Sequence, residues 1–263
     1  MEGIVQAVYY SAEKLLKNPH FHDCHQIILI LKGQVDFCVN GITTGAKAGD
    51  IAIFSRYENH AVHVRSEEYE RFVLHIDPTI VNGESPVYSL LSDRPTGFCN
   101  VVCVSPYLQE LVGIFKRLLD EQRSRSELAD EMQQLTVKQL LILLYRCMPV
   151  RFAGGYDPVV VGIKRQFEND YSRCYTLAEL AKQYNLSPSS LSHRFSAATG
   201  TSVMEYLFSC RMASAKRLLV GTDLDISQIV ERCGFSDNSN FSRTFKKRNG
   251  ISPKDFRKKF QAE

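Results

Sequence analysis

Short apolar runs with strand-like spacing fill the early part of the chain. They lie at residues 26–31, 35–39, 51–54, 61–64 and 71–76. Runs of this length bounded by turn residues are typical of β-strands, and Asn40-Gly41 predicts a two-residue hairpin turn between two of them. The pattern therefore predicts a small antiparallel sandwich or barrel over residues 26–76.

Helical spacing replaces the strand pattern further along the chain. Apolar residues recur every three or four positions over residues 106–122 and 126–147, and this period predicts two amphipathic helices. Glycines and a proline between Gly154 and Pro158 then interrupt the helical pattern. We therefore predict an α+β fold with an N-terminal domain at 1–150, a linker at 151–157 and an all-helical domain at 158–263.

The C-terminal part contains an internal repeat. Leu177, Leu180, Ala181, Asn185, Leu186 and Ser187 recur 49 positions later as Ile226, Ile229, Val230, Gly234, Phe235 and Ser236. Leu191, Ser192, Phe195 and Gly200 recur 50 positions later as Phe241, Ser242, Phe245 and Gly250. The offset grows because one extra residue enters the second loop. Two short helices joined by a tight turn, present twice, predict two helix-turn-helix units.

The turn positions carry residues suited to a tight turn between helices. Asn185 and Gly234 tolerate the left-handed backbone that ends a helix. Ser187 in the first copy, and Ser236 or Asp237 in the second, can cap the helix that follows. These residues support a helix-turn-helix interpretation of both copies.

One long helix is predicted between the copies, over residues 203–219, because its apolar residues recur with helical spacing. Such a helix would hold the two units at a fixed separation. If the second helix of each unit enters successive major grooves on one side of DNA, the helix centres lie ~34 Å apart.

Polar residues occupy the outward face of the second helix in each copy. Arg bonds bidentately to guanine and Asn to adenine, while Ser and His donate or accept at base edges. One copy alone would fit an ordinary solvent-exposed face equally well, but two copies in register favour DNA reading. The predicted base-reading residues are Ser189, Ser192, His193, Asn238, Ser239, Asn240 and Arg243. The predicted phosphate-binding residues are Arg194, Arg211, Lys216, Lys246, Lys247, Arg248 and Arg257.

Charge is divided unevenly between the two parts of the chain. The 263 residues include 32 Lys and Arg against 29 Asp and Glu. From Asp157 onward there are 17 basic and 11 acidic residues, whereas the preceding part has 15 and 18. A basic part favours contact with a polyanion, although a surplus of solvated lysines is the alternative on charge alone.

Several protein classes do not fit the sequence. The longest apolar runs, residues 27–31 and 140–145, are far shorter than the ~20 residues that span a bilayer. The first residues lack the basic and apolar regions of a secretory signal. The 8 cysteines form no Cys-x-x-Cys pair, which argues against a zinc ribbon or a thioredoxin-type site. We therefore expect a cytoplasmic protein without a membrane partner.

The repeat region is similar to a known family signature. Residues 217–256 include Ile226-Ser-Gln-Ile-Val-Glu-Arg-Cys-Gly-Phe-Ser and Gly250-Ile-Ser-Pro, and this stretch resembles the signature of AraC/XylS transcription regulators. The resemblance extends over residues 157–263. It implies a sequence-specific regulator that binds a double-stranded DNA operator, and RNA polymerase if it is an activator. The short Ser189 and Ser192 depart from the larger polar residues usual in the first unit.

The N-terminal part resembles the cupin-like sensor domain that many AraC-type regulators carry. The resemblance rests on residues 20–33, 40–41, 48–50 and 59–60. It implies a β-barrel whose interior binds a small-molecule effector, followed by helices that form a homodimer. Under this resemblance the helices within 106–147 make the dimer contact, while packing against the barrel is an equal alternative. The implied effector-binding residues are His20, His22, Gln26 and His60.

A metal-binding site is the alternative for these residues. In metal-binding cupins a similar spacing of two histidines, a glutamate and a later histidine holds a divalent ion. Gln26 stands here in place of the carboxylate, and an uncharged amide is a poorer ligand for a hard cation. We therefore expect no metal, no other cofactor and no enzymatic activity. The competing hypothesis is a metal-binding cupin enzyme fused to a DNA-binding module.

Overall fold

Strands come first along the chain and helices follow, in two units formed by Glu2–Tyr156 and Asp157–Glu263. The computed structural model describes residues 5–12, 16–39, 41–81, 87, 90–91, 100–124, 126–148 and 157–260. Asn40 of the predicted hairpin turn and residues 151–156 of the predicted linker lie outside the described residues.

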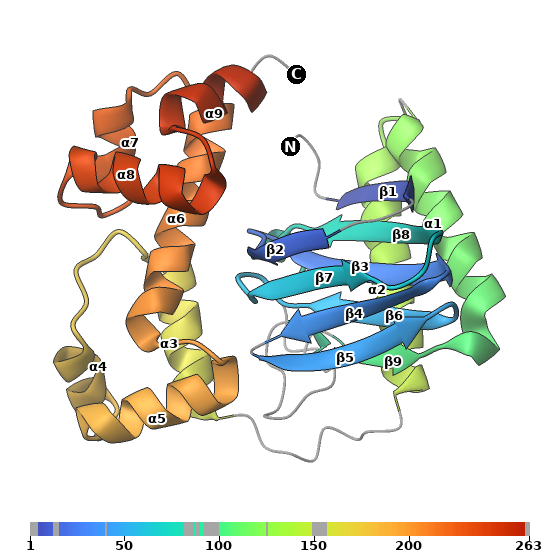
Figure 1. Cartoon of the computed structure of the whole chain (residues 1–263), viewed down its shortest axis with the longest axis horizontal. Helices are drawn as coiled ribbons and strands as arrows, with labels where there is room; N and C mark the ends of the chain where they lie inside the picture. The colour runs from blue at the N-terminus through green and yellow to red at the C-terminus, as the bar shows by residue number, and fades with distance from the viewer. Residues whose placement is uncertain are drawn as a thin grey trace. The chain divides into compact units, whose positions relative to one another are not determined.

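Two antiparallel sheets build the N-terminal unit (Figure 1). The five-stranded sheet has the order β1 (Val5–Ala12), β8 (Tyr69–Ile76), β3 (His25–Lys32), β6 (Asp50–Phe54) and β9 (Val101–Cys103). The four-stranded sheet has the order β2 (Leu16–His20), β7 (His60–Val64), β4 (Gln34–Val39) and β5 (Ile42–Lys47). The predicted antiparallel fold is confirmed. The apolar pattern missed β5 because it is a largely exposed edge strand with few apolar residues.

Two helices cover the outer face of the five-stranded sheet. They are α1 (Leu108–Arg123) and α2 (Ala129–Cys147), close to the predicted ranges, and short 3-10 turns lie at Pro78–Val81 and Ser105–Tyr107. Leu111 and Phe115 of α1 and Leu140 of α2 are buried against the sheet. Burying each such side chain contributes about 1.5 to 3 kcal/mol, so the helices are part of the core of the unit.

Strand β3 is apolar at successive positions because both of its faces are covered. Ile27 and Leu29 belong to the core beneath α1 and α2, whereas Ile28 and Ile30 belong to the core between the two sheets. Side chains alternate between the faces of a strand, so a strand covered on both faces carries apolar residues at successive positions.

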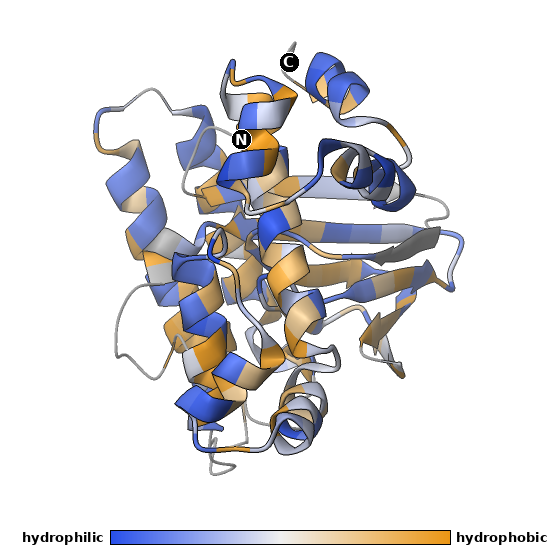
Figure 2. Cartoon of the chain, turned by 90° about the vertical axis from the view of Figure 1, so that its left-hand side faces the viewer, coloured by the Kyte–Doolittle hydropathy of each residue, from blue (hydrophilic) through white to orange (hydrophobic). Residues whose placement is uncertain are grey.

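The C-terminal unit is helical. Its helices are α3 (Pro158–Asn169), α4 (Leu177–Gln183), α5 (Pro188–Thr199), α6 (Val203–Gly221), α7 (Ile226–Arg232), α8 (Asn238–Asn249) and α9 (Pro253–Phe260). The predicted long helix is confirmed as α6, whose 19 residues span about 28 Å. In Figure 2 hydrophilic and hydrophobic residues alternate along the helices, as one buried face per helix requires. None of the described helices combines the length and apolar character needed to cross a bilayer.

The internal repeat is a structural repeat. Helices α4 and α7 begin at capping boxes, Thr176 with Glu179 and Asp225 with Gln228. A box of this kind satisfies backbone N–H groups that a helix start leaves without partners.

The second helix of each copy has matching ends as well. Ser187 caps α5 and Asp237 caps α8. Both helices end at glycines with positive φ, Gly200 at 70° and Gly250 at 78°. The two predicted helix-turn-helix units are confirmed, and of the two residues proposed to cap α8 the structure uses Asp237.

Candidate functional site

Helices α5 and α8, the second helix of each helix-turn-helix unit, each bury one face and expose another. Leu191 and Phe195 of α5, and Phe241 and Phe245 of α8, are buried. These pairs are separated by four residues, so they lie on one helix face. The polar residues between them are therefore directed away from the core of each unit.

Exposed polar side chains of α8 contact one another. Arg243 Nη2 donates to Asn240 Oδ1 at 3.2 Å, and Thr244 Oγ1 lies 3.5 Å from the same oxygen. Asn238 Nδ2 donates to Ser227 Oγ of α7 at 2.9 Å. These contacts place the Asn and Arg groups predicted to read bases together on the exposed face, next to Ser239.

The corresponding face of α5 carries shorter side chains. Ser189 Oγ lies 3.1 Å from Ser187 Oγ, Ser192 is half-buried and His193 is exposed. Ser190 is also exposed and corresponds to Asn240 at the offset of 50, a signal that the sequence prediction did not use.

All four arginines predicted to bind phosphate have partners inside the C-terminal unit. Arg194 forms two hydrogen bonds of 2.8 Å with Asp157, the N-cap of α3. Arg248 pairs with Glu205 and its guanidinium lies 4.5 Å from the Phe208 ring centroid. These two side chains tie α5 to α3 and α8 to α6.

The other two arginines donate to backbone carbonyl groups. Arg211 Nε and Nη2 donate to the carbonyl oxygens of Tyr171 and Arg173 at 2.8 and 2.9 Å. Arg257 donates to the carbonyl oxygens of Leu219 and Leu224. A carbonyl at a helix end needs such a donor, so Arg257 satisfies the end of α6. Sequence spacing did not indicate these structural roles.

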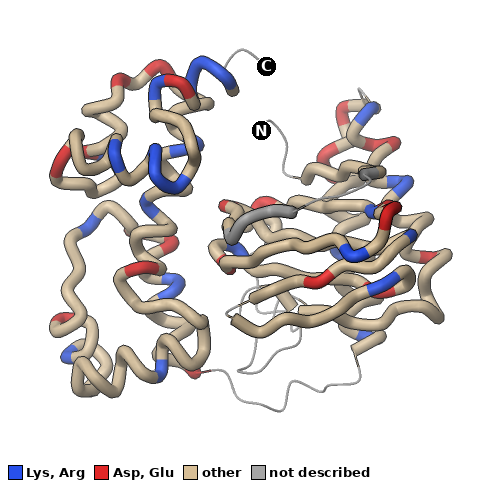
Figure 3. The backbone as a smooth tube through the Cα atoms, in the orientation of Figure 1, with Lys and Arg blue, Asp and Glu red and all other residues tan. Residues whose placement is uncertain are grey.

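Exposed lysines concentrate at the end of the second unit. Lys246 and Lys247 lie in the last turn of α8, and Lys258 and Lys259 in the last turn of α9. Figure 3 shows this basic region at the ends of the two helices. Positive charge is favourable there because a helix C-terminus carries partial negative charge. Lys216, also predicted to bind phosphate, is half-buried on α6.

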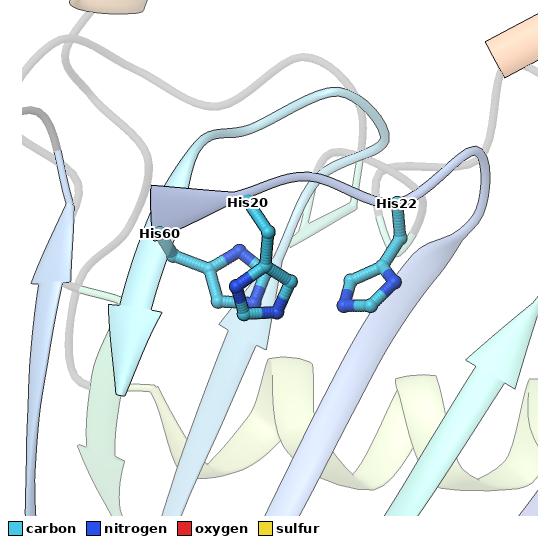
Figure 4. Close-up of side chains that lie close together, drawn as sticks. All are labelled: His20, His22 and His60. Atoms are coloured by element: carbon cyan, nitrogen blue, oxygen red, sulfur yellow. The ribbon is translucent and has the colours of Figure 1, made fainter. Parts of the chain in front are cut away.

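Three histidines meet in the N-terminal unit. The ligand nitrogens of His20, His22 and His60 lie within 4.8 Å of one another, and Figure 4 shows the three rings side by side. His20 and His60 are paired across β2 and β7, and His22 lies between β2 and β3. We call these three residues the histidine cluster.

Gln26 and His75 adjoin the histidine cluster. Gln26 Nε2 lies 2.9 Å from His75 Nε2 and 3.3 Å from His22 Nε2. Gln26 and His75 are cross-strand partners in β3 and β8. The sequence prediction missed His75, since nothing in the local pattern shows that β3 and β8 pair in this register.

The segment that carries His22 is held by polar contacts. The Arg56 guanidinium and the Tyr57 hydroxyl donate to Asp23 Oδ1 at 2.7 and 2.9 Å. Tyr57 N donates to the carbonyl oxygen of His22 at 2.9 Å. These contacts fix the connection between β2 and β3 against the start of the β6–β7 loop, and thereby position His22.

Arg71 is a second polar group in this unit that the sequence did not single out. Its side chain is buried, its guanidinium stacks on Tyr10 and Tyr69 at 4.9 and 4.5 Å, and Nη1 has no hydrogen-bond partner among the described residues. Burial lowers the pKa of Arg71, because a charge without a counter-ion is costly away from water. Strand alternation places Arg71 on the same face of β8 as Val73 and His75, toward the core between the sheets.

Comparison with known proteins identifies both units. The model of the AraC-like ligand binding domain matches residues 7–136, and the model of a helix-turn-helix domain matches residues 180–259. The chain belongs to the AraC family of transcription regulators. Its membership confirms the resemblance seen in the sequence and makes it a DNA-binding transcription regulator controlled by a small molecule.

Two proteins are similar to this chain over most of its length. The HTH-type transcriptional activator RhaS of Salmonella typhimurium is 24% identical over 249 residues, 90% of this chain and 86% of RhaS. The apo form of a ToxT variant from Vibrio cholerae matches with a TM-score of 0.64 at 15% identity, covering 98% of each chain. Wild-type ToxT with a bound unsaturated fatty acid matches with a TM-score of 0.61 at 15% identity, covering 98% of this chain and 96% of ToxT. The likeness to ToxT shows a common fold.

Proposed function

We propose that α5 and α8 of one chain enter successive major grooves of an operator, with α6 setting their separation. The observation that carries this proposal is the duplication itself, since both units have the same caps, turn and buried pairs, and both expose a polar helix face. The base-reading residues are Ser189, Ser192, His193, Asn238, Ser239, Asn240 and Arg243.

Phosphate contacts supply the affinity that is independent of sequence. We assign them first to Lys246 and Lys247, which are exposed at the end of α8. Arg194, Arg211, Lys216, Arg248 and Arg257 remain candidates for phosphate contact. The four arginines among them would also have to keep the structural contacts described above.

The N-terminal unit is proposed as the sensor, with a small-molecule effector bound beside His20, His22, Gln26 and His60. The buried Arg71 favours an effector that carries an anionic group, because the anion would supply a counter-charge. Effector binding then shifts the population between two placements of the DNA-binding units, by no more than its difference in affinity for the two states.

We further infer that the protein acts in the cytoplasm as a regulator without enzymatic activity, and that an activating form contacts RNA polymerase. RhaS, the relative named above, is a transcriptional activator, which supports this inference. A metal-binding enzyme fused to a DNA-binding module remains the competing function, and turnover of a substrate by the purified protein would favour it.

A homodimer through α2 completes the proposal. Met132, Leu135 and Ile142 are 49%, 60% and 42% exposed, on a helix whose other face is buried in the core. Their spacing of three and seven residues makes a stripe along one helix face. One face of α2 packs on the sheet and the other is exposed. The exposed face supports the dimer contact considered from sequence, and the buried face supports packing against the sheet.

Selection of bound sequences from random DNA by the full-length protein tests the DNA proposal. The expected motif has, for each bound chain, two blocks of conserved bases about 10 base pairs apart, since one helical turn separates successive major grooves on one side. A motif with one block, or no enrichment at low salt, would contradict the use of both units.

The replacement Leu135→Glu tests the dimer. It places a charge in the apolar stripe, so the sedimentation coefficient should change from that of a dimer to that of a monomer. Ile42→Glu on β5 is the matched control, because Ile42 is 70% exposed and outside the stripe. A monomeric wild-type protein, or equal dissociation by both variants, would refute the α2 interface.

A further inference from the structure

The histidine cluster has the ligand set of a transition-metal site. The nitrogens of His20, His22 and His60 are within 4.8 Å of one another. Zinc–nitrogen bonds of about 2.0 to 2.1 Å place the nitrogens of a tetrahedral site about 3.4 Å apart. Rotations of the two half-buried side chains, His20 and His22, can close this difference without moving the strands.

His60 is oriented as metal-ligating histidines commonly are. Its Nδ1 lies 3.0 Å from the carbonyl oxygen of Glu58. Because a carbonyl oxygen only accepts, Nδ1 carries the proton, and Nε2 of the neutral ring keeps its lone pair. The ring is buried and stacked on Phe54, with 4.1 Å between centroids and 13° between planes. A histidine that binds a metal commonly donates its other ring N–H to a carbonyl oxygen, which fixes the orientation of the ring and makes it a stronger ligand. His60 has this hydrogen bond and a fixed ring plane.

The structure gives Gln26 a different role from the one considered in the sequence. From sequence, Gln26 stands where a carboxylate ligand would be, and this argued against a metal. In the fold its amide lies between His22 and His75. As placed, the amide Nε2 donates to Nε2 of His22 and of His75. A half-turn of the amide exchanges its donor and its acceptor, and Oε1 then accepts the proton on Nε2 of His22 and leaves Nδ1 of His22 for an ion. Gln26 is thus a positioning residue, and the site does not need it as a ligand.

We propose that His20, His22 and His60 bind one divalent transition-metal ion of the zinc class, with one coordination position open. Three neutral imidazoles favour Zn²⁺, Co²⁺ or Ni²⁺ over Mg²⁺ and Ca²⁺, which prefer oxygen ligands. Three protein ligands in a tetrahedral site leave a fourth position for water or a donor atom of the effector. This inference rests on the proposed function in one respect, namely that the interior of the N-terminal unit is the sensor site.

Equilibrium dialysis of the full-length, metal-free protein against Zn²⁺ tests the site. Wild-type protein should bind one Zn²⁺ per chain, and His60→Ala should weaken binding by more than about 100-fold, because even outer-shell partners are worth about 10- to 100-fold. His63→Ala is the matched control, since His63 lies on the same strand but is exposed. If His60→Ala does not fold, His22→Ala at a half-buried position gives the same readout.

Cobalt provides a second readout, because its visible absorption reports the coordination geometry of the bound ion. Co²⁺ added to the wild type should give the intense visible absorption of a four-coordinate ion, and His22→Ala should abolish it. Absence of stoichiometric Zn²⁺ binding, or equal loss in His63→Ala and His60→Ala, would overturn the metal site. If the metal-free protein still selects DNA sequences, such a result leaves the regulator proposal standing. Failure of DNA selection in both metal-free and metal-loaded protein would instead refute the regulator proposal.

Discussion

The first helix-turn-helix unit, α4 with α5, and the second, α7 with α8, share their backbone design but differ in their exposed side chains. Helices α5 and α8 both have 12 residues and both end at a left-handed glycine. At matching positions α5 carries Ser190 and His193 where α8 carries Asn240 and Arg243. The two copies thus share the residues that fold the unit, while the surfaces proposed to meet DNA differ.

Charge sharpens the contrast between the units. Ser196 and Ala197 of α5 stand at the positions of Lys246 and Lys247 in α8, and Arg194 of α5 is engaged by Asp157. The second unit therefore offers more groups to phosphates and larger groups to bases. We expect it to supply most of the DNA affinity, while the first unit contributes mainly position.

The largest expected effect is a difference in stability between substitutions in the two helix-turn-helix turns. Gly234 has φ of 74°, and a Cβ there would clash with the carbonyl oxygen of Ser172. Gly234→Ala should therefore lower the free energy of unfolding by about 3 kcal/mol. Asn185, at the same place in the first unit, has φ of 54°, and Asn185→Ala should cost only about 1 kcal/mol. Urea unfolding measures both values, and equal costs would remove this difference between the turns.

Base reading should depend more on the second unit than on the first. Arg243→Ala should weaken operator binding by about 1 to 3 kcal/mol and relax the preference at one base pair. His193→Ala at the matching position should cost less. Fluorescence anisotropy with operator variants at each base pair measures both effects. An unchanged base preference in Arg243→Ala would exclude Arg243 from reading.

The salt dependence of binding tests the charge difference directly. Lys247→Ala should weaken binding to all sequences alike and flatten the log-log salt slope by about one unit. Ala197→Lys, which gives the first unit the residue of the second, should steepen the slope by a similar amount. A sequence-selective loss in Lys247→Ala would contradict a phosphate role.

The smallest expected effect concerns the ion pairs that hold the reading helices. Burial opposes ionisation of Asp157, but hydrogen bonds from Arg194 and from the α3 backbone outweigh it and hold its pKa below the ordinary value of 3.8. A lowered pKa stabilises the fold above about pH 4, and this contribution is lost as the pH falls through the folded value.

Asp157→Asn should therefore reduce the loss of stability between pH 5 and acid pH by less than about 1 kcal/mol, while asparagine still caps α3. Glu205→Gln removes the more exposed pair with Arg248 and is the comparison variant. Thermal unfolding across this pH range measures both. An unaltered pH profile in Asp157→Asn would show that the pair with Arg194 does not contribute to stability.

The C-terminal unit was predictable from sequence in most of its detail. Its caps, turns and buried pairs depend on residues within a few positions of one another, so local spacing specifies them. The partners of Arg194, Arg211 and Arg257 were not predictable, because Asp157 and the carbonyl groups they contact lie 33 to 40 positions away in the chain. A pattern of basic residues does not distinguish a free guanidinium from one that holds two helices together.

Sequence alone determined the alternation of apolar residues, the duplicated helices and the order of strands before helices, because each follows from contacts along a short stretch of chain. The tertiary structure decided which distant side chains meet. His20 faces His60, and Gln26 faces His75, only because β2 pairs with β7 and β3 with β8 in one register. A shift of one residue would turn these side chains to the opposite face of the sheet. Strand register is fixed by packing of the whole unit. The family resemblance grouped His20, His22, Gln26 and His60, but only the fold shows how their side chains meet and that His75 joins them.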